Sequence, residues 1–206
     1  MPAYFNISLV FERKDIQPDF TRNVHNLLHN AGFVFKSGCY DAKEYSLEEL
    51  LSWNQKHLED NFHLGFTEHR SHDYKQMYFE YEGFSEVRGF WMNNYPEDDE
   101  FTLEIIIPED EIIDYDGSGN YGYSYNVKEI HMLKDACKVL WNSPLVKMIQ
   151  TGLESCDEVV PIRDIQAGAL PNMYPFAIVP DELAGNLSKE LCVEYIECGG
   201  TLVQEM

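Results

Sequence analysis

Three short runs of apolar and aromatic residues, QMYFEY (76–81), EVRGFWM (86–92) and FTLEIII (101–107), decide the fold of this chain. Each run is rich in the β-branched and aromatic residues that favour strands. Turn-forming residues separate them, EGF at 82–84 and NNYP at 93–96. Because strands joined in sequence by short turns form an antiparallel meander, we expect a mostly antiparallel sheet.

The segment before the meander contains a further strand and two helices. Residues 4–11 are aromatic and β-branched, as in a buried strand, and a short second strand is expected at 33–35. The first helix starts after Pro18, ends at Gly32 and directs His25 and His29 toward solvent. The second helix starts at a capping box formed by Ser46 and Glu49 and ends near Asn61.

The segment after the meander contains the clearest amphipathic helix, Val127–Trp141. Its predicted inward residues are Val127, Ile130, Leu133, Cys137 and Leu140. Pro144 interrupts it, and we expect a second helix over 145–153. Extended segments are expected at 158–163, 176–179, 192–197 and 201–204. The chain is therefore predicted to be one domain, residues 1–206, of α+β class, with helices packed on one face of the sheet.

The charge of the chain restricts the classes of partner. It has 36 acidic and 15 basic side chains among 206 residues, a formal net charge of −21. Such a charge repels nucleic-acid phosphates and anionic lipid headgroups, which bind clustered Lys and Arg. We therefore expect no nucleic-acid or membrane partner and favour a basic protein. The alternative is that the charge serves solubility alone.

The cysteines and the start of the chain indicate an intracellular protein. Five cysteines are scattered, and no two have Cys-x-x-Cys spacing, which disfavours a disulfide framework or a zinc ribbon. The first residues lack the basic start and apolar core of a signal peptide, and no stretch has the roughly 20 apolar residues of a membrane helix. The expected location is the cytoplasm.

Two acidic runs flank the third strand of the meander, EDDE at 97–100 and EDE at 109–111. Such runs can stop an apolar strand from aggregating. They can also form a docking rim for a basic partner. In this second interpretation the contact residues are Asp98, Asp99, Glu100, Glu109, Asp110 and Glu111.

The segment DYDGSGNYGYSY (114–125) is rich in glycine and tyrosine. Exposed tyrosine beside carboxylate is typical of protein-binding surfaces, so Tyr121 and Tyr123 join the predicted contact surface. The alternative is that the rings pack back on the sheet.

A Gly-x-Gly-x-x-Gly match at 117–122 lacks the strand and helix of a dinucleotide site. Asp114 and Asp116 fit a calcium loop only in part, because Tyr125 replaces its bidentate Glu.

Catalytic and metal signatures are weak. No nucleophile motif of the Gly-x-Ser-x-Gly or Ser-x-x-Lys type is present. His69 and His72, with Asp114 and Asp116, are the best metal candidates, but adjacent histidines without cysteine specify little. We therefore expect no metal and no cofactor.

These features favour a non-enzymatic, acidic protein-binding domain. In composition, though not by any motif, the chain resembles the small acidic cytoplasmic proteins with which bacteria neutralise toxins. That resemblance implies an immunity-type inhibitor that masks a basic toxin or enzyme, and it assigns no residue. The alternative is an enzyme or a metal-dependent protein whose site assembles from distant residues.

Overall fold

The computed structural model describes residues 3–40, 43–61, 63–64, 75–93, 98–117, 122–153, 159–185, 187 and 191–205. Its strands are β1 Tyr4–Glu12, β2 Val34–Tyr40, β3 Lys43–Tyr45, β4 Gln76–Glu80, β5 Val87–Met92, β6 Glu100–Pro108, β7 Ile113–Asp114, β8 Ser124–Tyr125, β9 Met148–Leu153, β10 Phe176–Pro180, β11 Leu191–Ile196 and β12 Gly200–Glu205. Its α-helices are α1 Phe20–Asn30, α2 Leu47–Glu59, α3 Val127–Trp141, α4 Ile162–Gln166 and α5 Asp181–Ala184. Short 3₁₀ turns occupy η1 Arg13–Asp15, η2 Glu109–Glu111 and η3 Glu197–Gly199.

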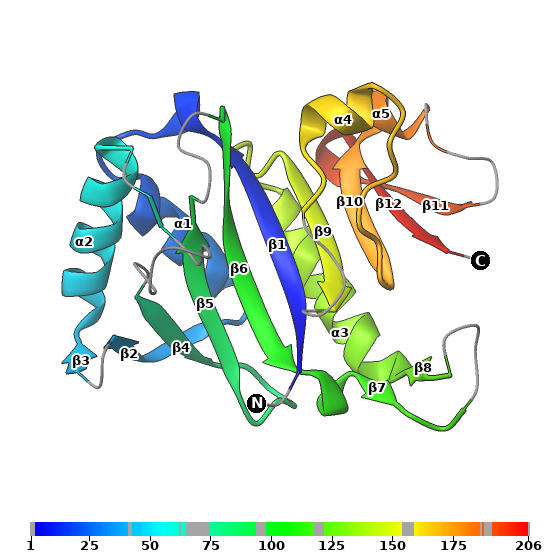
Figure 1. Cartoon of the computed structure of the whole chain (residues 1–206), viewed down its shortest axis with the longest axis horizontal. Helices are drawn as coiled ribbons and strands as arrows, with labels where there is room; N and C mark the ends of the chain where they lie inside the picture. Colours follow the sequence, from blue (N-terminus) through cyan, green and yellow to red (C-terminus); the bar gives the residue numbers. More distant parts are fainter. Residues whose placement is uncertain are drawn as a thin grey trace.

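Ten of the described strands form one sheet in the order β11-β12-β10-β9-β1-β6-β5-β4-β2-β3. Every pair of neighbours in this sheet is antiparallel. The predicted meander is confirmed as β4, β5 and β6, and β1 pairs with β6 over nine consecutive residues. Figure 1 shows β1 and β6 side by side at the centre of the molecule. The fold is α+β, as the sequence predicts.

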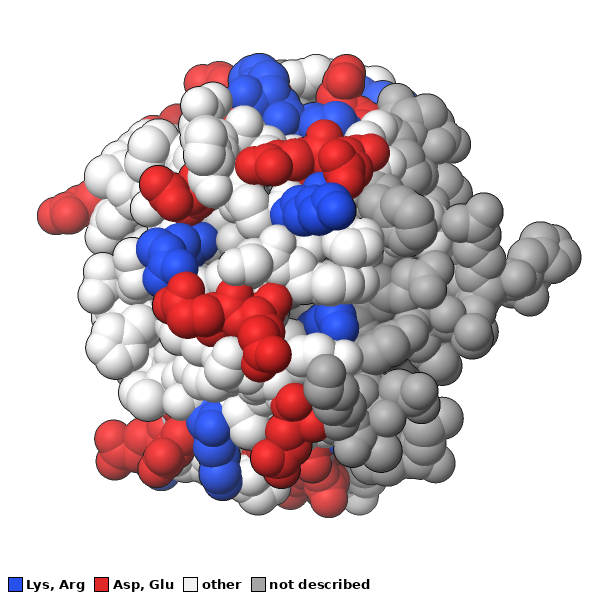
Figure 2. Space-filling model, turned by 90° about the vertical axis from the view of Figure 1, so that its left-hand side faces the viewer, with Lys and Arg blue, Asp and Glu red and all other residues white. Residues whose placement is uncertain are grey.

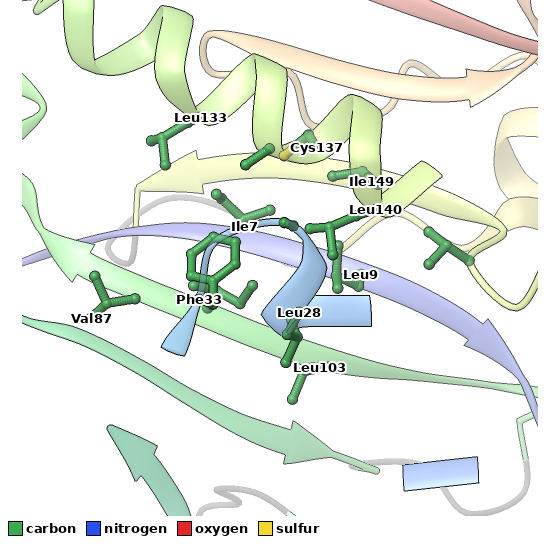
Figure 3. Close-up of a cluster of buried hydrophobic side chains, with 14 of the residues drawn as sticks. Ile7, Leu9, Leu28, Phe33, Val87, Leu103, Leu133, Cys137, Leu140 and Ile149 are labelled. Carbon is green, nitrogen blue, oxygen red and sulfur yellow. The ribbon is translucent and has the colours of Figure 1, made fainter. Parts of the chain in front are cut away.

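The main core lies between one face of the sheet and the three long helices. Alternate residues of β1, such as Ile7 and Leu9, point to this face and are fully buried. They meet Leu133, Cys137 and Leu140 of α3 and Leu28 of α1 (Figure 3). Burial raises the pKa of the Cys137 thiol, as expected for a cysteine that packs as a small hydrophobe.

The second face of the sheet is covered at its C-terminal side by the two short helices. Ile165 of α4 and Leu183 of α5 pack in a separate buried cluster against Val10, Val179 and Val203. In Figure 1 these helices lie in front of the sheet, and α3 lies behind it. The long helices thus share one face, as predicted, and α4 and α5 add cover on the other. The rest of this second face carries both polar and apolar side chains of β1, β5 and β6, such as Asn6, Arg88 and Phe90.

The capping box at the start of α2 is confirmed. Glu49 N–H donates to the Ser46 hydroxyl at 3.3 Å, and Ser46 N–H donates to the Glu49 carboxylate at 2.9 Å. The helix then packs closely on β2 at Gly38, where an added Cβ would lie 2.1 Å from Leu50. Gly38 therefore fixes the distance between α2 and the sheet.

Two segments differ in type from their predictions. Residues 148–153 form strand β9 instead of a helix, and the extended segment expected at 158–163 ends in helix α4, which begins at Ile162. β9 lies between β1 and β10, and both of its faces are covered, since Ile149 packs in the main core and Met148 in the cluster with α4 and α5. The run MIQTGL carries buried Gln150 and Thr151 among its apolar residues, so it shows neither the alternation of a half-buried strand nor a continuous apolar run, and its pattern does not identify a strand. α4 is too short for its periodicity to show.

Three smaller predictions are also corrected. The strand expected at 33–35 continues to Tyr40 as β2. Val127 is 82% exposed instead of inward, because it starts α3 one turn before the helix reaches the core at Ile130. His25 is half-buried, with its ring edge-on to Phe35, and burial lowers its pKa. No helix of the described residues has the length and apolar character needed to cross a membrane.

Candidate functional site

Strand β6 connects the two acidic runs, so the runs lie at opposite ends of the sheet. Asp98 and Asp99 precede the strand and Glu100 is its first residue, whereas Glu109, Asp110 and Glu111 form η2 directly after its last residue. A strand of nine residues spans about 30 Å. The two runs therefore cannot form one compact patch, and each end has to be analysed with its own neighbours. Glu97 lies outside the described residues.

The end that contains Asp98, Asp99 and Glu100 is named here the arginine end. Arg13 reaches it from η1: its Nε donates to the carbonyl of Asp98 at 2.9 Å, and its backbone N–H donates to the carbonyl of Asp99 at 2.8 Å. Its guanidinium also lies 5.7 Å from the centre of the Phe101 ring. Partial burial lowers the pKa of Arg13, and the charges of Asp99 and Asp98 oppose this effect.

The other acids of the arginine end also have basic or N–H partners within the chain. Arg163 lies 3.4 Å from Asp98, and Lys147 lies 2.8 Å from Asp15. Glu100 accepts a hydrogen bond of 3.1 Å from the first backbone N–H of α4, at Ile162. Burial still raises the pKa of Glu100, since this bond and Arg163 offset only part of the desolvation. Basic side chains of the protein thus lie among the carboxylates of this end and offset part of their charge.

The end that contains Glu109, Asp110 and Glu111 is named the hairpin end, because β7 and β8 form a small hairpin beside it. Glu111 accepts the backbone N–H of Ser85 at 2.9 Å, which fixes the turn between β4 and β5 against η2. Glu109 is buried and hydrogen-bonded to the Tyr115 hydroxyl. Asp110 is exposed. Two carboxylates of this run therefore stabilise the local structure, and the third faces solvent.

Carboxylates outnumber basic groups at the hairpin end. The acidic side chains of the turn, η2 and the hairpin are Glu82, Glu86, Glu109, Asp110, Glu111, Asp114 and Asp116. Arg88 pairs with Glu86, and Lys128 of α3 pairs with Glu129. Within the described part of the chain, no ion pair forms at Asp110, Glu111 or Asp114. The hairpin end therefore keeps an excess of negative charge.

The side of the molecule formed by α2 and β3 carries charges of both signs. Figure 2 shows this side, where acidic and basic side chains alternate over the residues that are coloured. Arg22 and Glu48 form one such pair, with the guanidinium and carboxylate in double contact. The pattern is that of a solvated surface in which neither sign dominates.

The tyrosines of the hairpin divide into two groups. Tyr115 is 70% exposed, although its hydroxyl contacts Glu109. Tyr123 and Tyr125 are half-buried, lie edge-to-face with centroids 5.5 Å apart, and pack against the main core. Tyr123 and Tyr125 therefore follow the alternative stated above, in which the rings pack back on the protein. Tyr121 lies outside the described residues.

The metal candidates are not brought together in the described residues. His69 and His72 fall outside them. Asp114 pairs across the hairpin with Ser124, whose hydroxyl lies 3.1 Å from the Asp116 carboxylate. Within the part of the chain that is described, no group of three or more His, Cys, Asp or Glu side chains has a metal-binding arrangement. Asp114 and Asp116 therefore serve as hairpin residues in this arrangement.

Sequence reasoning missed a buried carboxyl group in the middle of β6. Glu104 points to the second face of the sheet, where the hydroxyls of Ser8 and Thr102 each lie 2.5 Å from one of its oxygens. Asn6 donates a third bond at 3.2 Å. Complete burial without a cationic partner raises the pKa of Glu104. The alternation of FTLEIII does place Glu104 on the face of Thr102, but its burial depends on partners nearly 100 residues away.

The described residues border two open hollows. The larger one, about 430 Å³, is lined by Tyr45, Trp53 and acidic residues of α2, and the ammonium of Lys75 lies 3.8 Å from the centre of the Tyr45 ring. The smaller one, about 210 Å³, lies beside Lys134 and His131 of α3. Burial lowers the pKa of Lys134, whose ammonium hydrogen-bonds Gln204. The lysine of each hollow is thus already engaged by the protein.

No protein-family model, curated protein or solved structure matches this chain. The assignment of a function therefore depends on the chemistry of the described surfaces.

Proposed function

We propose that this protein is a non-enzymatic binding protein for a basic protein, with the hairpin end as its contact surface. The observation that supports this most is the difference in charge balance between the two ends of β6. At the arginine end the charges of Arg13, Lys147 and Arg163 lie among the carboxylates, whereas the hairpin end has an excess of carboxylates. A charge that the chain does not balance itself can attract an opposite charge on a partner.

The chemistry of the hairpin end suits protein contact in two further ways. Tyr115 presents an exposed ring beside Asp114 and Asp116, and tyrosine adds contact area with little loss of conformational entropy. Glu109, Glu111 and the packed rings of Tyr123 and Tyr125 hold the surrounding backbone in place. A surface that is ordered before it meets its partner loses less free energy on binding.

The finer proposal is an immunity-type inhibitor that neutralises a basic toxin or enzyme in the bacterial cytoplasm. It rests on the net charge of −21 and on the resemblance in composition. An inhibitor of this kind would set the carboxylates of the hairpin end against the cationic groups of its target. Electrostatic attraction then raises the rate of capture, which matters for a protein that must act before a toxin does.

The first test is capture of the partner by three forms of the protein. The hairpin variant carries Glu82→Gln, Asp110→Asn and Asp114→Asn. The matched arginine-end variant carries Asp98→Asn, Asp99→Asn and Asp164→Asn, where Asp164 of α4 lies 3.8 Å from the Arg163 guanidinium. Each variant thus removes three negative charges. Chemical cross-linking in cells followed by mass spectrometry should recover a basic protein with the wild type and the arginine-end variant, and several-fold less with the hairpin variant. Equal recovery by all three forms, or an acidic partner, would contradict the proposal.

The alternative function, an enzyme or a metal-dependent protein, would use the hollow beside Lys134 or the residues His69, His72, Asp114 and Asp116. Elemental analysis of the dialysed protein distinguishes a metal-dependent protein from the binding protein. The binding proposal predicts no stoichiometric zinc, because the cysteines and histidines of the sequence lack the spacing of a closed four-ligand site. One zinc per chain would favour the alternative.

A further inference from the structure

Strand β11 forms one edge of the ten-stranded sheet. Among the described strands its only neighbour is β12, with which it pairs over six residues without a bulge. Its other side therefore presents backbone N–H and C=O groups to which another strand can pair. Natural proteins often protect such an edge with Lys, Pro or a bulge. The sequence of β11, LCVEYI, contains neither Lys nor Pro.

The side chains of β11 leave a partly apolar stripe at this edge. Val193 is 50% exposed and Tyr195 is 75% exposed. Both lie on the second face of the sheet, because Val193 is opposite Val203, which is buried in the cluster beneath α4 and α5. Leu191 has the same orientation and packs partly against that cluster. An added strand would extend both the backbone ladder and this stripe.

The charges around β11 favour a basic segment as the strand that pairs with this edge. Asp181 accepts a hydrogen bond of 2.6 Å from Thr201, the residue opposite Tyr195, and Glu182 and Glu197 are exposed nearby in the chain. Among the described residues, Lys138 already pairs with Glu194 at 2.7 Å, and Lys134 is hydrogen-bonded to Gln204 of β12. An extended segment rich in Lys or Arg complements this edge. A second copy does not, because each copy carries a net charge of −21.

We propose that the β11 edge binds an extended, basic segment of the partner as an additional strand of the sheet. This inference rests on the proposed function and specifies its binding mode. Backbone hydrogen bonds to an edge strand provide affinity, and alternate side chains provide specificity. In Figure 1 the β11 edge and the β7–β8 hairpin lie toward the same end of the longest axis. One basic partner can therefore use the hairpin end for attraction and the β11 edge for docking.

The test uses two peptides of alternating Lys and Val with identical charge. In the second peptide every other backbone nitrogen is methylated, which removes the donors that pair with an edge strand. The wild type should bind the unmethylated peptide about tenfold more tightly, since several backbone hydrogen bonds are lost on methylation. Hydrogen exchange followed by NMR should show that this peptide slows exchange of the amides of β11.

Two variants separate this inference from the proposed function. The double variant Val193→Ser and Tyr195→Ser removes the stripe at constant charge, and it should abolish the preference between the peptides. The hairpin variant should weaken both peptides by the same factor and keep that preference. Equal affinity for the two peptides, with both weakened in the hairpin variant, would overturn strand addition while the basic-partner function stands.

Two further results would count against the inference. If neither peptide binds the wild type, both the binding mode and the function lose their support. If sedimentation detects a dimer that the double variant no longer forms, the occupant of the edge is a second copy and the basic segment is excluded. The double variant should show the circular-dichroism spectrum of the wild type, because both side chains are exposed.

Discussion

The two ends of β6 carry acidic runs of similar composition that have different roles in the fold. At the arginine end, the carbonyls of Asp98 and Asp99 hold Arg13, and Glu100 receives an N–H of α4. At the hairpin end, Glu109 and Glu111 order the local backbone, whereas Asp110 and Asp114 face solvent without an ion pair in the described residues. The difference shows that the number of acidic residues in a run does not determine the charge available to a partner. The basic side chains that pack against the run determine how much of its charge is available to a partner.

The largest effect should come from removing Arg13. Replacing Arg13 by Ala removes its hydrogen bonds to the carbonyl of Asp98 and to the side-chain oxygen of Asn93, and it exposes part of the Phe101 ring. We expect the free energy of unfolding to fall by about 2 kcal/mol, since two hydrogen bonds to a charged donor are lost. Urea denaturation measures this change.

The matched control at the hairpin end is Lys128→Ala. Lys128 is exposed and its contact with Glu129 is long, at 3.6 Å, so its removal should cause no measurable loss of stability. If the Arg13 and Lys128 variants were equally stable, the arginine end would not be held together by its basic residue, and the contrast between the two ends would fail.

A second, smaller effect is the pH dependence of stability caused by Glu104, which lies in β6 between the two ends. The pKa of Glu104 is raised in the folded protein, so above the unfolded value of 4.5 the folded protein retains a proton that the unfolded chain releases. Its contribution to stability is therefore complete below this value and decreases as the pH rises toward the folded pKa, by up to about 1.4 kcal/mol per pH unit. Glu104→Gln should lack this decrease.

Denaturant midpoints of the wild type and the Glu104→Gln variant between pH 4 and pH 8 measure the effect. The difference between the two proteins isolates Glu104 from Glu100, whose pKa is also raised. Parallel curves over this range would show that Glu104 is ionised in the folded protein. In that case Glu104 would be a second charged carboxylate within β6 besides Glu100, and the comparison between the two ends of the strand would need revision.

The smallest effect should come from Tyr115→Phe. The substitution removes the hydroxyl that contacts Glu109 but keeps the exposed ring. We expect a loss of stability of about 0.5 to 1 kcal/mol, typical of one hydrogen bond. Partner binding should change little if the ring, and not the hydroxyl, makes the contact. A tenfold loss of affinity would instead show that the orientation of Glu109 controls the contact surface.

The sequence predicted the strand and its flanking acids but not their partners. The run FTLEIII and the acids around it are local features, so β6 and the position of both runs followed from composition. Arg13 lies 85 residues before Asp98, and no local pattern connects them. The same limit applies to Glu104, whose hydroxyl partner Ser8 is 96 residues away.

The error at β9 has a related cause. Residues 148–153 are buried on both faces because α3 packs on one face and α4 and α5 pack on the other, and the neighbouring strands β1 and β10 come from the two ends of the chain. Its side chain Gln150 also has distant partners, since it accepts the N–H groups of Val160 and Asn172. Tertiary contacts of this kind override local pattern, and a single sequence does not display them.

The most direct test of the central claim is the rate at which the purified partner associates with the hairpin variant and with the arginine-end variant. Both lose three negative charges, so a rate set by net charge alone would fall equally in the two. If the hairpin end is the contact surface, the hairpin variant should associate several-fold more slowly than the arginine-end variant at low ionic strength. The difference should shrink near physiological salt, where the Debye length is about 8 Å. Equal rates for the two variants at every salt concentration would contradict the central claim.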